Sequence, residues 1–401
     1  MSKAERATGL GEEFFAVSAP GLEAVVAAEL KGLGVNGEVV PGGVVWRGGI
    51  AGMRRVNLNV RTAARVLMRV CEFRARTFFE LERHAARVPW SRFVGPGAPV
   101  QLRVTSRKSR LYHEGAIAER LARAVAESAG ARVVERVTEE EGDAAQLFVV
   151  RVNRDDFTVS ADTSGALLHR RGYRQEVARA PLRENLAAAL LEAAGWRGAA
   201  PLLDPFCGSG TIPIEAALVA RRIPPGLANP EHRSRRYAFE RWPEHDEAGW
   251  QREVEEARSG IREAAAVAIV GSDRSAAAVR AARGNAERAG VAGDIDFEVV
   301  AMSRAPVPAE RGVLVTNPPY GVRVTVDEAM RRLYAEFGGL VRARMSGWRV
   351  VMLSPDAKLE RETRLGFRVI AETRNGGIPV RLVEAGPQRG RENDGGPGRY
   401  D

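Results

Sequence analysis

Cysteine and histidine are scarce in this sequence. Its 401 residues include only two cysteines, Cys71 and Cys207, and five histidines. The two cysteines are far apart, and the chain has neither a CxxC pair nor a Cys/His cluster. This pattern argues against a disulfide framework and against a structural zinc site, and it fits a reducing compartment. We therefore expect no metal.

Long hydrophobic runs are missing as well. No stretch approaches the roughly 18 apolar residues that span a bilayer. The opening residues, Met-Ser-Lys-Ala-Glu-Arg-Ala-Thr-Gly, lack the apolar segment of a signal peptide. Apolar residues make up 45% and charged residues 28% of the chain, as in soluble proteins with sizeable cores. A length of 401 residues predicts two or three domains, and we expect a cytoplasmic protein.

Positive charge is in excess. The formal net charge is +9 and the sequence pI is about 10.1, with arginine as the main cation. High-GC codon usage would enrich arginine throughout the chain, whereas a polyanion partner would favour clusters of arginine that neutralise phosphates. Composition leaves both explanations open, and clustering is what separates them.

The first 165 residues predict two α+β segments. Residues 13–73 contain short strands and two amphipathic helices, a pattern typical of a ferredoxin-like domain. Residues 74–165 predict a second domain, and residues 166–180 a hinge. The expected strands are 14–18, 39–40, 44–46, 66–73, 100–105, 146–152 and 156–162, and the expected helices are 22–33, 49–59, 77–88 and 114–128.

Residues 181–385 alternate strand and helix signals, which predicts an α/β domain with a mostly parallel, Rossmann-like sheet. Residues 221–260 look like an irregular insertion, and residues 386–401 are predicted to be a disordered tail. The expected strands are 202–204, 268–273, 297–300, 313–316 and 349–353, and the expected helices follow 181, 211 and 273.

A glycine turn follows the first of these strands. The segment Leu-Asp-Pro-Phe-Cys-Gly-Ser-Gly-Thr, residues 203–211, leads from an apolar run into a helix. Gly208 and Gly210 let the backbone bend and approach a ligand closely. There is no Gly-Lys-Ser/Thr, so a nucleoside triphosphate is disfavoured. Asp204 would repel phosphate and suits a cationic ligand, with a turn or cap carboxylate as the alternative.

Two further residues bear on this turn. Asp273 ends the next predicted strand, where a carboxylate can accept hydrogen bonds from ribose hydroxyls; a helix N-cap is the alternative. Cys207 could be taken for a nucleophile, but a cysteine inside such a loop is better interpreted as a small packing residue.

A second motif follows a later strand. Residues 317–320 read Asn-Pro-Pro-Tyr. The Asn317 side-chain oxygen and the Pro318 carbonyl can accept both hydrogens of an exocyclic amine, which aims the nitrogen lone pair at an electrophile. Pro318 and Pro319 fix the turn, so ordering it costs little entropy. Tyr320 can stack on a flipped-out base. An ordinary turn with an exposed tyrosine is the alternative.

Together the two motifs resemble the cofactor and catalytic loops of S-adenosylmethionine-dependent amino-methyltransferases. The chain is most similar to the THUMP-domain RNA guanine-N2-methyltransferases that modify bacterial large-subunit ribosomal RNA. The resemblance covers about 13–385. It also includes Pro20-Gly-Leu-Glu23, Asn57 to Arg65, Ser106 to His113, Asp162 to Arg174, and Ala180 to Ala187.

The family resemblance implies a ferredoxin-like domain, a THUMP RNA-binding domain at 74–165 and a Rossmann-like methyltransferase domain. It implies S-adenosylmethionine as cofactor, RNA as partner, and Asn317, Pro318, Pro319 and Tyr320 as catalytic residues. The implied cofactor residues are Asp204, Phe206, Cys207, Gly208, Ser209, Gly210, Thr211, Asp273, Ala301, Met302 and Asn317. The residues expected to bind RNA are Arg103, Arg107, Lys108, Arg110, Tyr112, His113, Arg170, Arg171, Arg174 and Arg323.

The sequence departs from the family pattern at two positions. The family has an aspartate that reaches the adenine amine where this chain has Ala301, and Ser303 or backbone groups are the candidates to replace it. An acidic residue commonly precedes the arginine at position 323, and here Val322 does. Guanine-N2 methylation of tRNA, adenine-N6 methylation of DNA, and a non-catalytic RNA-binding or assembly factor remain as alternative functions.

Overall fold

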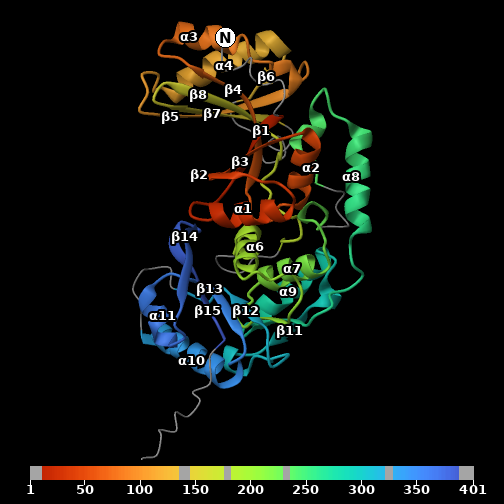
Figure 1. The fold of residues 1–401 in the computed structure, drawn as a ribbon, viewed down its shortest axis with the longest axis vertical. Helices are drawn as coiled ribbons and strands as arrows, with labels where there is room; N and C mark the ends of the chain where they lie inside the picture. The colour runs from red at the N-terminus through yellow and green to blue at the C-terminus, as the bar shows by residue number, and fades with distance from the viewer. Residues whose placement is uncertain (1–10, 135–144, 176–181, 229–234, 321–327, 388–401) are drawn as a thin grey trace, which may run out of the picture. The chain divides into compact units, whose positions relative to one another are not determined.

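The computed structural model describes residues 11–134, 145–175, 182–228, 235–320 and 328–387. The chain forms two compact units. The first unit comprises Met1–Arg171, Pro224–Leu227 and His232–Gly260, and the second comprises Gly172–Ile223, Ala228–Glu231 and Ile261–Asp401. Each unit is built on one β-sheet (Figure 1).

The sheet of the first unit has the strand order β2-β3-β1-β4-β8-β7-β5-β6. It is antiparallel except for β5, which runs parallel to β6 and β7. The strands are β1 Glu12–Val17, β2 Glu38–Val40, β3 Gly43–Gly48, β4 Arg65–Arg74, β5 Pro99–Arg107, β6 Arg132–Val133, β7 Gln146–Asn153 and β8 Asp156–Asp162.

Strand β4 joins the two segments that the sequence divides at 73/74. It pairs with β1 on one side and with β8 on the other, both antiparallel. Val66, Leu67 and Met68 of this strand are buried, and its pairing with β8 shifts register between Arg69 and Cys71. The segments 13–73 and 74–165 therefore share one continuous sheet.

Among the described residues, the helices α1 Glu23–Gly32, α2 Ile50–Asn59, α3 Phe78–Ala85 and α4 Glu114–Ala129 cover this sheet. Helix α3 begins with a capping box, in which Thr77 accepts from the Glu80 amide and Glu80 accepts from the Thr77 amide. Helix α4 buries one residue per turn (Ile117, Leu121, Val125 and Ala129), which is the spacing of an amphipathic helix.

The inserted segment is not irregular throughout, contrary to the sequence prediction. Residues 224–227 and the described part of 232–260 belong to the first unit and contain the helix α8 Glu247–Ser259. Tyr237, Phe239 and Trp250 pack on one another, with ring centroids 5.2 to 5.6 Å apart. The Trp242 indole donates to Gln146 Oε1 over 2.9 Å. Spacing could not show this, because the aromatics gain their burial from distant parts of the chain.

The sheet of the second unit has the order β11-β10-β9-β12-β13-β15-β14. The first five strands are parallel and β15 is antiparallel to both neighbours, which confirms the predicted Rossmann-like fold class. The strands are β9 Leu202–Asp204, β10 Ile269–Asp273, β11 Asp296–Val299, β12 Val313–Thr316, β13 Arg349–Ser354, β14 Arg368–Asn375 and β15 Ile378–Ala385.

Helices cover both faces of this sheet (Figure 1). Helix α7 Thr211–Ala220 contacts α6 Glu184–Ala193 and α9 Ala276–Arg288, while α10 Glu328–Arg344 contacts α11 Ala357–Thr363. Tyr334 and Phe337 of α10 and Leu359 of α11 pack in one cluster with buried residues of β9, β12 and β13. Each such buried side chain contributes about 1.5–3 kcal/mol. The hairpin β14–β15 and the helices α10 and α11 were not among the predicted elements.

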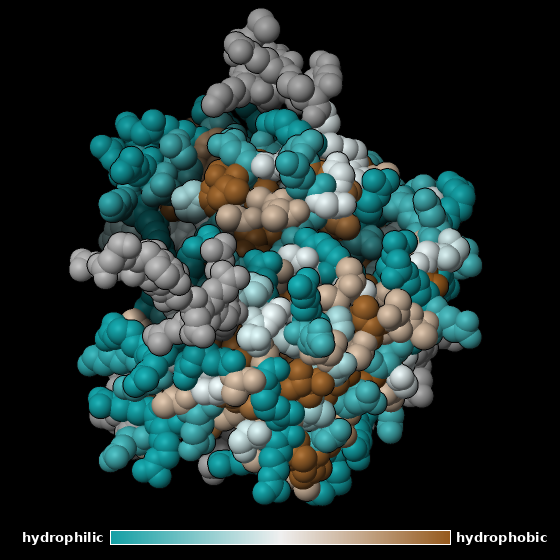
Figure 2. Space-filling view, turned by 60° about the horizontal axis from the view of Figure 1, so that its bottom comes forward, coloured by the Kyte–Doolittle hydropathy of each residue, from teal (hydrophilic) through white to brown (hydrophobic). Residues whose placement is uncertain are grey.

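On the face drawn in Figure 2, apolar residues form small separate groups among hydrophilic ones. The described part of the chain contains no helix that is both long enough and apolar enough to cross a membrane.

Candidate active site

The predicted cofactor and catalytic motifs meet where the strand order of the second sheet reverses. Strand β9 lies between β10 and β12, and all three are parallel, so their carboxyl ends share one edge. These ends carry Asp204, Asp273 and Thr316-Asn317. In open α/β sheets such a switch point is where ligands bind.

The glycine turn has the left-handed backbone that its composition predicts. Gly208 has φ +52° and Gly210 has φ +84°. A Cβ at Gly210 would lie 2.9 Å from the Ala282 Cβ, so this glycine is also required by close packing. A Cβ at Gly208 would meet no atom within 4 Å. Gly208 therefore borders open space, which leaves room for a ligand against its backbone.

Asp204 is buried at the end of β9, with 1% of its surface exposed. Its Oδ1 accepts from Thr316 Oγ1 over 2.6 Å and from the Phe206 amide over 3.1 Å. Its pKa is raised to about 7, mainly by burial and in smaller part by the nearby Asp273, and these two hydrogen bonds oppose the rise. A cation bound at this carboxylate would favour the ionised form.

Asp273 ends β10 and holds the turn. Its Oδ2 accepts from the Gly208 amide over 3.1 Å, and its Oδ1 accepts from the Ser275 amide over 2.9 Å. The N-cap of α9 is Ser275, whose hydroxyl accepts from the Ala278 amide. The alternative of Asp273 as N-cap is therefore wrong, because the carboxylate lies two residues earlier and faces the glycine turn.

The remaining residues of the turn are wholly or partly buried. Cys207 is 6% exposed, and burial raises the pKa of its thiol well above the ordinary value, which suits a packing residue and opposes a nucleophile. Phe206 packs on Phe337, with ring centroids 6.1 Å apart. Ser209 and Thr211 are buried at the start of α7.

The predicted catalytic motif begins at Asn317, directly after β12. Asn317 is partly buried, and its Oδ1 is a buried acceptor without a hydrogen-bond partner among the described residues. Pro318 is buried. An unsatisfied buried acceptor costs free energy in the free protein, about 1–3 kcal/mol, unless a ligand or water donates to it. The structure thus holds an amide oxygen ready to accept from an amine.

Tyr320 is held from the hairpin β14–β15. Asn375, the last residue of β14, donates from Nδ2 to the Tyr320 hydroxyl over 2.6 Å. Burial raises the pKa of Tyr320, and the hydrogen bond from Asn375 opposes that shift. Tyr320 as a whole is partly buried.

Ala301 and Met302 follow the edge strand β11. Val299 pairs in register with Asp273, and it is 47% exposed. Ala301 is exposed and Met302 is buried. The position that lacks the family aspartate thus lies two residues beyond Val299, the register partner of Asp273.

Comparison with known proteins agrees with this geometry. Residues 171–383 match a family model described as the RMKL-like methyltransferase domain, and residues 13–67 match the RlmL ferredoxin-like domain. The first match covers more than half of the chain. This chain belongs to the RMKL-like methyltransferase family. The predicted methyltransferase family is confirmed, and so is the predicted ferredoxin-like domain.

Relatives of the RMKL-like family align over most of this chain. A candidate RNA methyltransferase of Synechocystis sp. is 33% identical over 375 residues, covering 92% of this chain and 96% of the relative. The ribosomal RNA large subunit methyltransferase K/L of Syntrophotalea carbinolica is 35% identical over 385 residues, covering 92% and 53%. This chain spans about half the length of such K/L relatives.

Solved structures share the whole fold. A candidate methyltransferase solved with S-adenosylhomocysteine has a TM-score of 0.82 at 31% identity, covering 95% of this chain and 100% of that one. A structure from Listeria monocytogenes, described as a predicted N6-adenine-specific DNA methylase, has a TM-score of 0.78 at 30% identity, covering 96% and 99%. The fold of this RMKL-like methyltransferase is therefore that of a SAM-dependent enzyme.

Most of the predicted RNA-binding residues of this RMKL-like methyltransferase are on the surface of its first unit. Tyr112 is 67% exposed, and its ring lies 4.2 Å from that of His113 at an interplanar angle of 38°. The exposed residues are Arg103, Arg107, Lys108, Arg110, Tyr112, His113 and Arg170.

Two predicted RNA contacts are corrected by the structure. Arg171 is 6% exposed, and its guanidinium donates to the Leu168 and Arg61 carbonyls, so it serves the fold of the first unit. Arg174 lies in the second unit, with 17% of its side chain exposed, and it pairs with the buried Glu184 over 3.3 Å. Neither guanidinium is available to a phosphate here. Arg323 lies outside the described residues.

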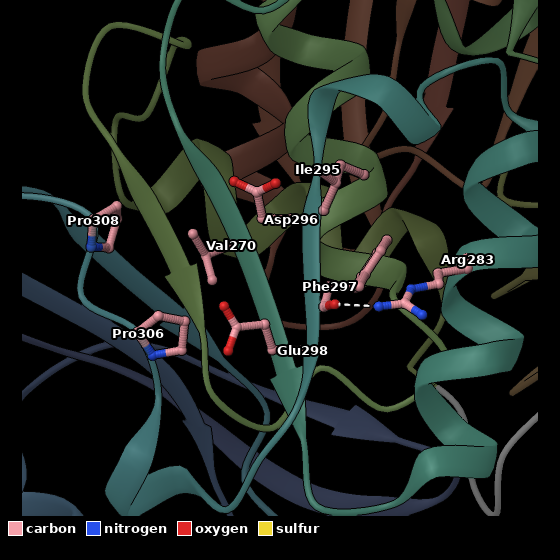
Figure 3. Close-up of a pocket in the computed structure, with 8 residues that line it drawn as sticks. All are labelled: Val270, Arg283, Ile295, Asp296, Phe297, Glu298, Pro306 and Pro308. Atoms are coloured by element: carbon pink, nitrogen blue, oxygen red, sulfur yellow. Dashed lines mark hydrogen bonds between the residues drawn. The ribbon is translucent and has the colours of Figure 1, made fainter.

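A separate open pocket of about 480 Å³ lies along the edge strand β11. Figure 3 shows Asp296 and Glu298 in it, with Arg283 donating to the Phe297 carbonyl. It is lined by none of the predicted site residues, so it belongs to the sheet edge and not to the switch point. The described residues contain no group of three or more His, Cys, Asp or Glu side chains that could hold a metal.

Three supporting residues escaped the sequence analysis. Thr316 bonds Asp204, Asn375 bonds Tyr320, and the buried Asn285 donates to the Ser209 carbonyl over 3.0 Å. Thr316 directly precedes the Asn-Pro-Pro-Tyr motif and could have been noticed there. Asn285 and Asn375 are distant in sequence from their partners, and only the fold brings them together.

Proposed function

We propose that this protein transfers a methyl group from S-adenosylmethionine to the exocyclic N2 of a guanine in structured RNA, with large-subunit ribosomal RNA as the substrate. Membership of the methyltransferase family supports the cofactor, and so does the S-adenosylhomocysteine complex of a relative. The observation that carries the choice of an amine as methyl acceptor is the buried, unpartnered Asn317 Oδ1.

The residues at the switch point fit this cofactor. Asp204 supplies a buried carboxylate at the end of β9, and only its Oδ1 has hydrogen-bond partners among the described residues. Gly208 leaves open space beside its backbone. The start of α7 presents amide groups towards the same edge of the sheet. Asp204, Asp273 and the glycine turn would hold the cofactor, which supplies an electrophilic methyl group when bound.

The protein's own contribution to the reaction is alignment. Asn317 Oδ1 and the Pro318 carbonyl accept the two hydrogens of the amine and thereby direct its lone pair. The consecutive prolines keep this turn rigid, so little conformational freedom is lost on binding. Tyr320, fixed by Asn375, stacks on the base. Positioning of this kind supplies much of the rate without an acid or base of high reactivity.

The RNA assignment rests on the first unit. Arg103, Arg107, Lys108 and Arg110 are exposed beside the exposed ring of Tyr112. Cations interleaved with aromatics suit phosphate contact and base stacking in RNA. We propose that the segment 74–165 is a THUMP domain with this role. Ribosomal RNA as substrate is supported by the names of the K/L relatives.

Methyl transfer tests the proposal directly. Labelled S-adenosylmethionine is offered separately to unmodified ribosomal RNA, unmodified tRNA and unmethylated DNA, and the modified nucleoside is identified. We expect N2-methylguanosine in ribosomal RNA. Label in tRNA alone would mean that the substrate is tRNA. N6-methyladenine in DNA would mean that the methyl acceptor is the adenine N6 amine. The absence of both cofactor binding and methyl transfer would favour a non-catalytic RNA-binding factor.

A further inference from the structure

Three chain segments meet at one end of the sheet of the first unit. They are residues 74–79, which begin at the last residue of β4, residues 106–113, which lead from the end of β5 to α4, and residues 153–156, which form the β7–β8 turn. We call this set the basic tip. Arg107 and Asn153 are register partners in the parallel pair β5–β7, and Arg74 and Asp156 are partners in β4–β8. The three segments are therefore neighbours.

One carboxylate ties these segments together. Asp155, 9% exposed, accepts from the Arg110 amide through Oδ1 over 2.8 Å. Its Oδ2 pairs with Arg76 Nε over 3.2 Å. Its own amide donates to Ser109 Oγ over 3.0 Å, and its carbonyl accepts from the Ala75 amide over 3.1 Å. A single residue thus contacts both of the other segments.

The backbone of the tip is held in a costly conformation. Lys108, Arg154 and Asp155 have φ of 50°, 52° and 68°, in the left-handed region that favours glycine. Arg154 and Asp155 are the two central residues of a two-residue hairpin turn, where Asn-Gly is the usual sequence. At these positions glycine would relieve the backbone strain. Strain that is retained in this way is typical of functional surfaces.

The tip concentrates positive charge. Arg74, Arg76, Arg107, Lys108, Arg110 and Arg154 are all exposed. The side chains of Arg107, Lys108, Arg110 and Arg154 form no ion pair within the described part of the chain, whereas Asp155 and Asp156 pair with Arg76 and Arg74. Glu80 and Glu114 are engaged as acceptors of backbone amides in the same segments. The cations therefore outnumber the acids.

Two exposed aromatic rings accompany these cations. Phe79 is 73% exposed at the first turn of α3, three residues after Arg76, and Tyr112 is 67% exposed in the linking segment. Exposed rings beside cations favour unpaired bases, which can stack, over the stacked interior of a DNA duplex.

We infer that Asp155 is a positioning residue that organises the basic tip as an RNA-binding surface, and that this surface extends to Arg74, Arg76, Phe79 and Arg154. This inference rests on the proposed function, since it names the surface that would hold the RNA substrate. Asp155 itself repels phosphate; it acts by fixing the loop that carries Arg107, Lys108 and Arg110.

The test measures a change in RNA affinity. The predicted change is a decrease, whereas the loss of a negative charge alone would increase the affinity. Asp155→Asn and Asp155→Gly each remove a negative charge, which by itself strengthens binding to a polyanion. If Asp155 organises the tip, both variants instead bind a fluorescein-labelled RNA stem-loop with a single-stranded extension about fivefold more weakly than the wild type. Asp155→Gly keeps the hairpin turn, because glycine suits its positive φ.

Asp156→Asn is the matched control. Asp156 is the next residue, 68% exposed at its side chain, with a long contact of 3.9 Å to Arg74. This variant should bind RNA as tightly as the wild type or more tightly. Arg76→Ala and Arg154→Ala, which remove exposed cations, should weaken binding and lower the slope of log affinity against log salt by about 1 each.

The outcomes separate this inference from the proposed function. If both Asp155 variants bind RNA like Asp156→Asn, Asp155 has no organising role, and methyl transfer by the wild type would leave the proposed function intact. If the Asp155 variants lose RNA binding while the wild type transfers no methyl group, only the proposed function fails. Equal competition by duplex DNA would contradict an RNA surface.

Discussion

Two aspartates, Asp204 in the second unit and Asp155 in the first, organise the two candidate functional regions in opposite ways. Asp204 is the last residue of β9, and Asp155 lies in the turn between β7 and β8. Each accepts a hydrogen bond from a backbone amide two or more residues away. Burial raises the pKa of Asp204 to about 7. The Arg110 amide, together with Arg76, lowers the pKa of Asp155 below its ordinary value.

The difference teaches how the same side chain serves two purposes. Asp204 has no cation among its partners, so its ionised form is disfavoured until a positive ligand arrives. Asp155 already has its cation in Arg76 and is ionised at neutral pH. A buried carboxylate without a counter-charge is suited to bind a ligand, whereas a paired one is suited to hold a loop.

The largest expected effect separates the two regions outright. Asn317→Ala removes the amide oxygen that accepts from the amine, and methyl transfer should fall by about 100-fold or more. RNA binding, which we assign to the other unit, should change less than about twofold by fluorescence anisotropy. Equal losses of methyl transfer and RNA binding would contradict the separation of the two regions.

Asp204→Asn is expected to have the next largest effect. In the wild type, affinity for S-adenosylmethionine should rise with pH through about 7, because the cation favours the ionised carboxylate. The variant should bind about tenfold more weakly at pH 8, which corresponds to about 1.4 kcal/mol, and its affinity should no longer depend on pH in this range. Calorimetric titration at pH 6, 7 and 8 measures both effects.

The same substitution should stabilise the ligand-free protein at high pH. Between pH of about 4 and 7 the folded protein retains a proton on Asp204 that the unfolded chain has released. The free energy of unfolding of the wild type therefore falls as pH rises through this window. Denaturant unfolding should show a stability difference between Asp204→Asn and wild type that grows with pH; a constant difference would mean that Asp204 is not buried in its acid form.

Replacing Arg107, Lys108 and Arg110 together by alanine tests whether these cations of the first unit bind RNA. RNA binding should weaken, and the slope of log affinity against log salt should fall by about 2–3, because three phosphate contacts are lost. Affinity for S-adenosylmethionine should stay within about twofold of the wild type. An unchanged salt slope would mean that the RNA contacts lie elsewhere.

The smallest expected effect concerns the partner of Asp204. In the wild type, the Thr316 hydroxyl donates to Asp204 Oδ1, and this hydrogen bond lowers the pKa of Asp204. Thr316→Val removes that hydroxyl. The pKa of Asp204 should therefore rise, and the pH dependence of cofactor affinity should move to higher pH with little change at its plateau. Thr316→Ser, which keeps the hydroxyl, is the control and should retain the wild-type profile.

The sequence predicted the parts of the site that are local. The glycine turn, the acid at the end of β9 and the Asn-Pro-Pro-Tyr motif are each contiguous, because their chemistry needs fixed spacing on one strand end. The fold class followed from alternating strands and helices. The insertion was misjudged, since its aromatic residues are buried only by distant neighbours, and Arg171 looked like a surface cation among the others.

By itself, then, the sequence determined which groups stand at the end of which strand, because backbone turns and periodicity are properties of neighbouring residues. The tertiary structure decided how these groups are charged and what they touch. It buried Asp204 beside Thr316, brought Asn375 to Tyr320 and joined Asp155 to Arg76. Burial and pairing arise between residues far apart in the chain, and they set the pKa of a carboxylate more strongly than its sequence neighbours do.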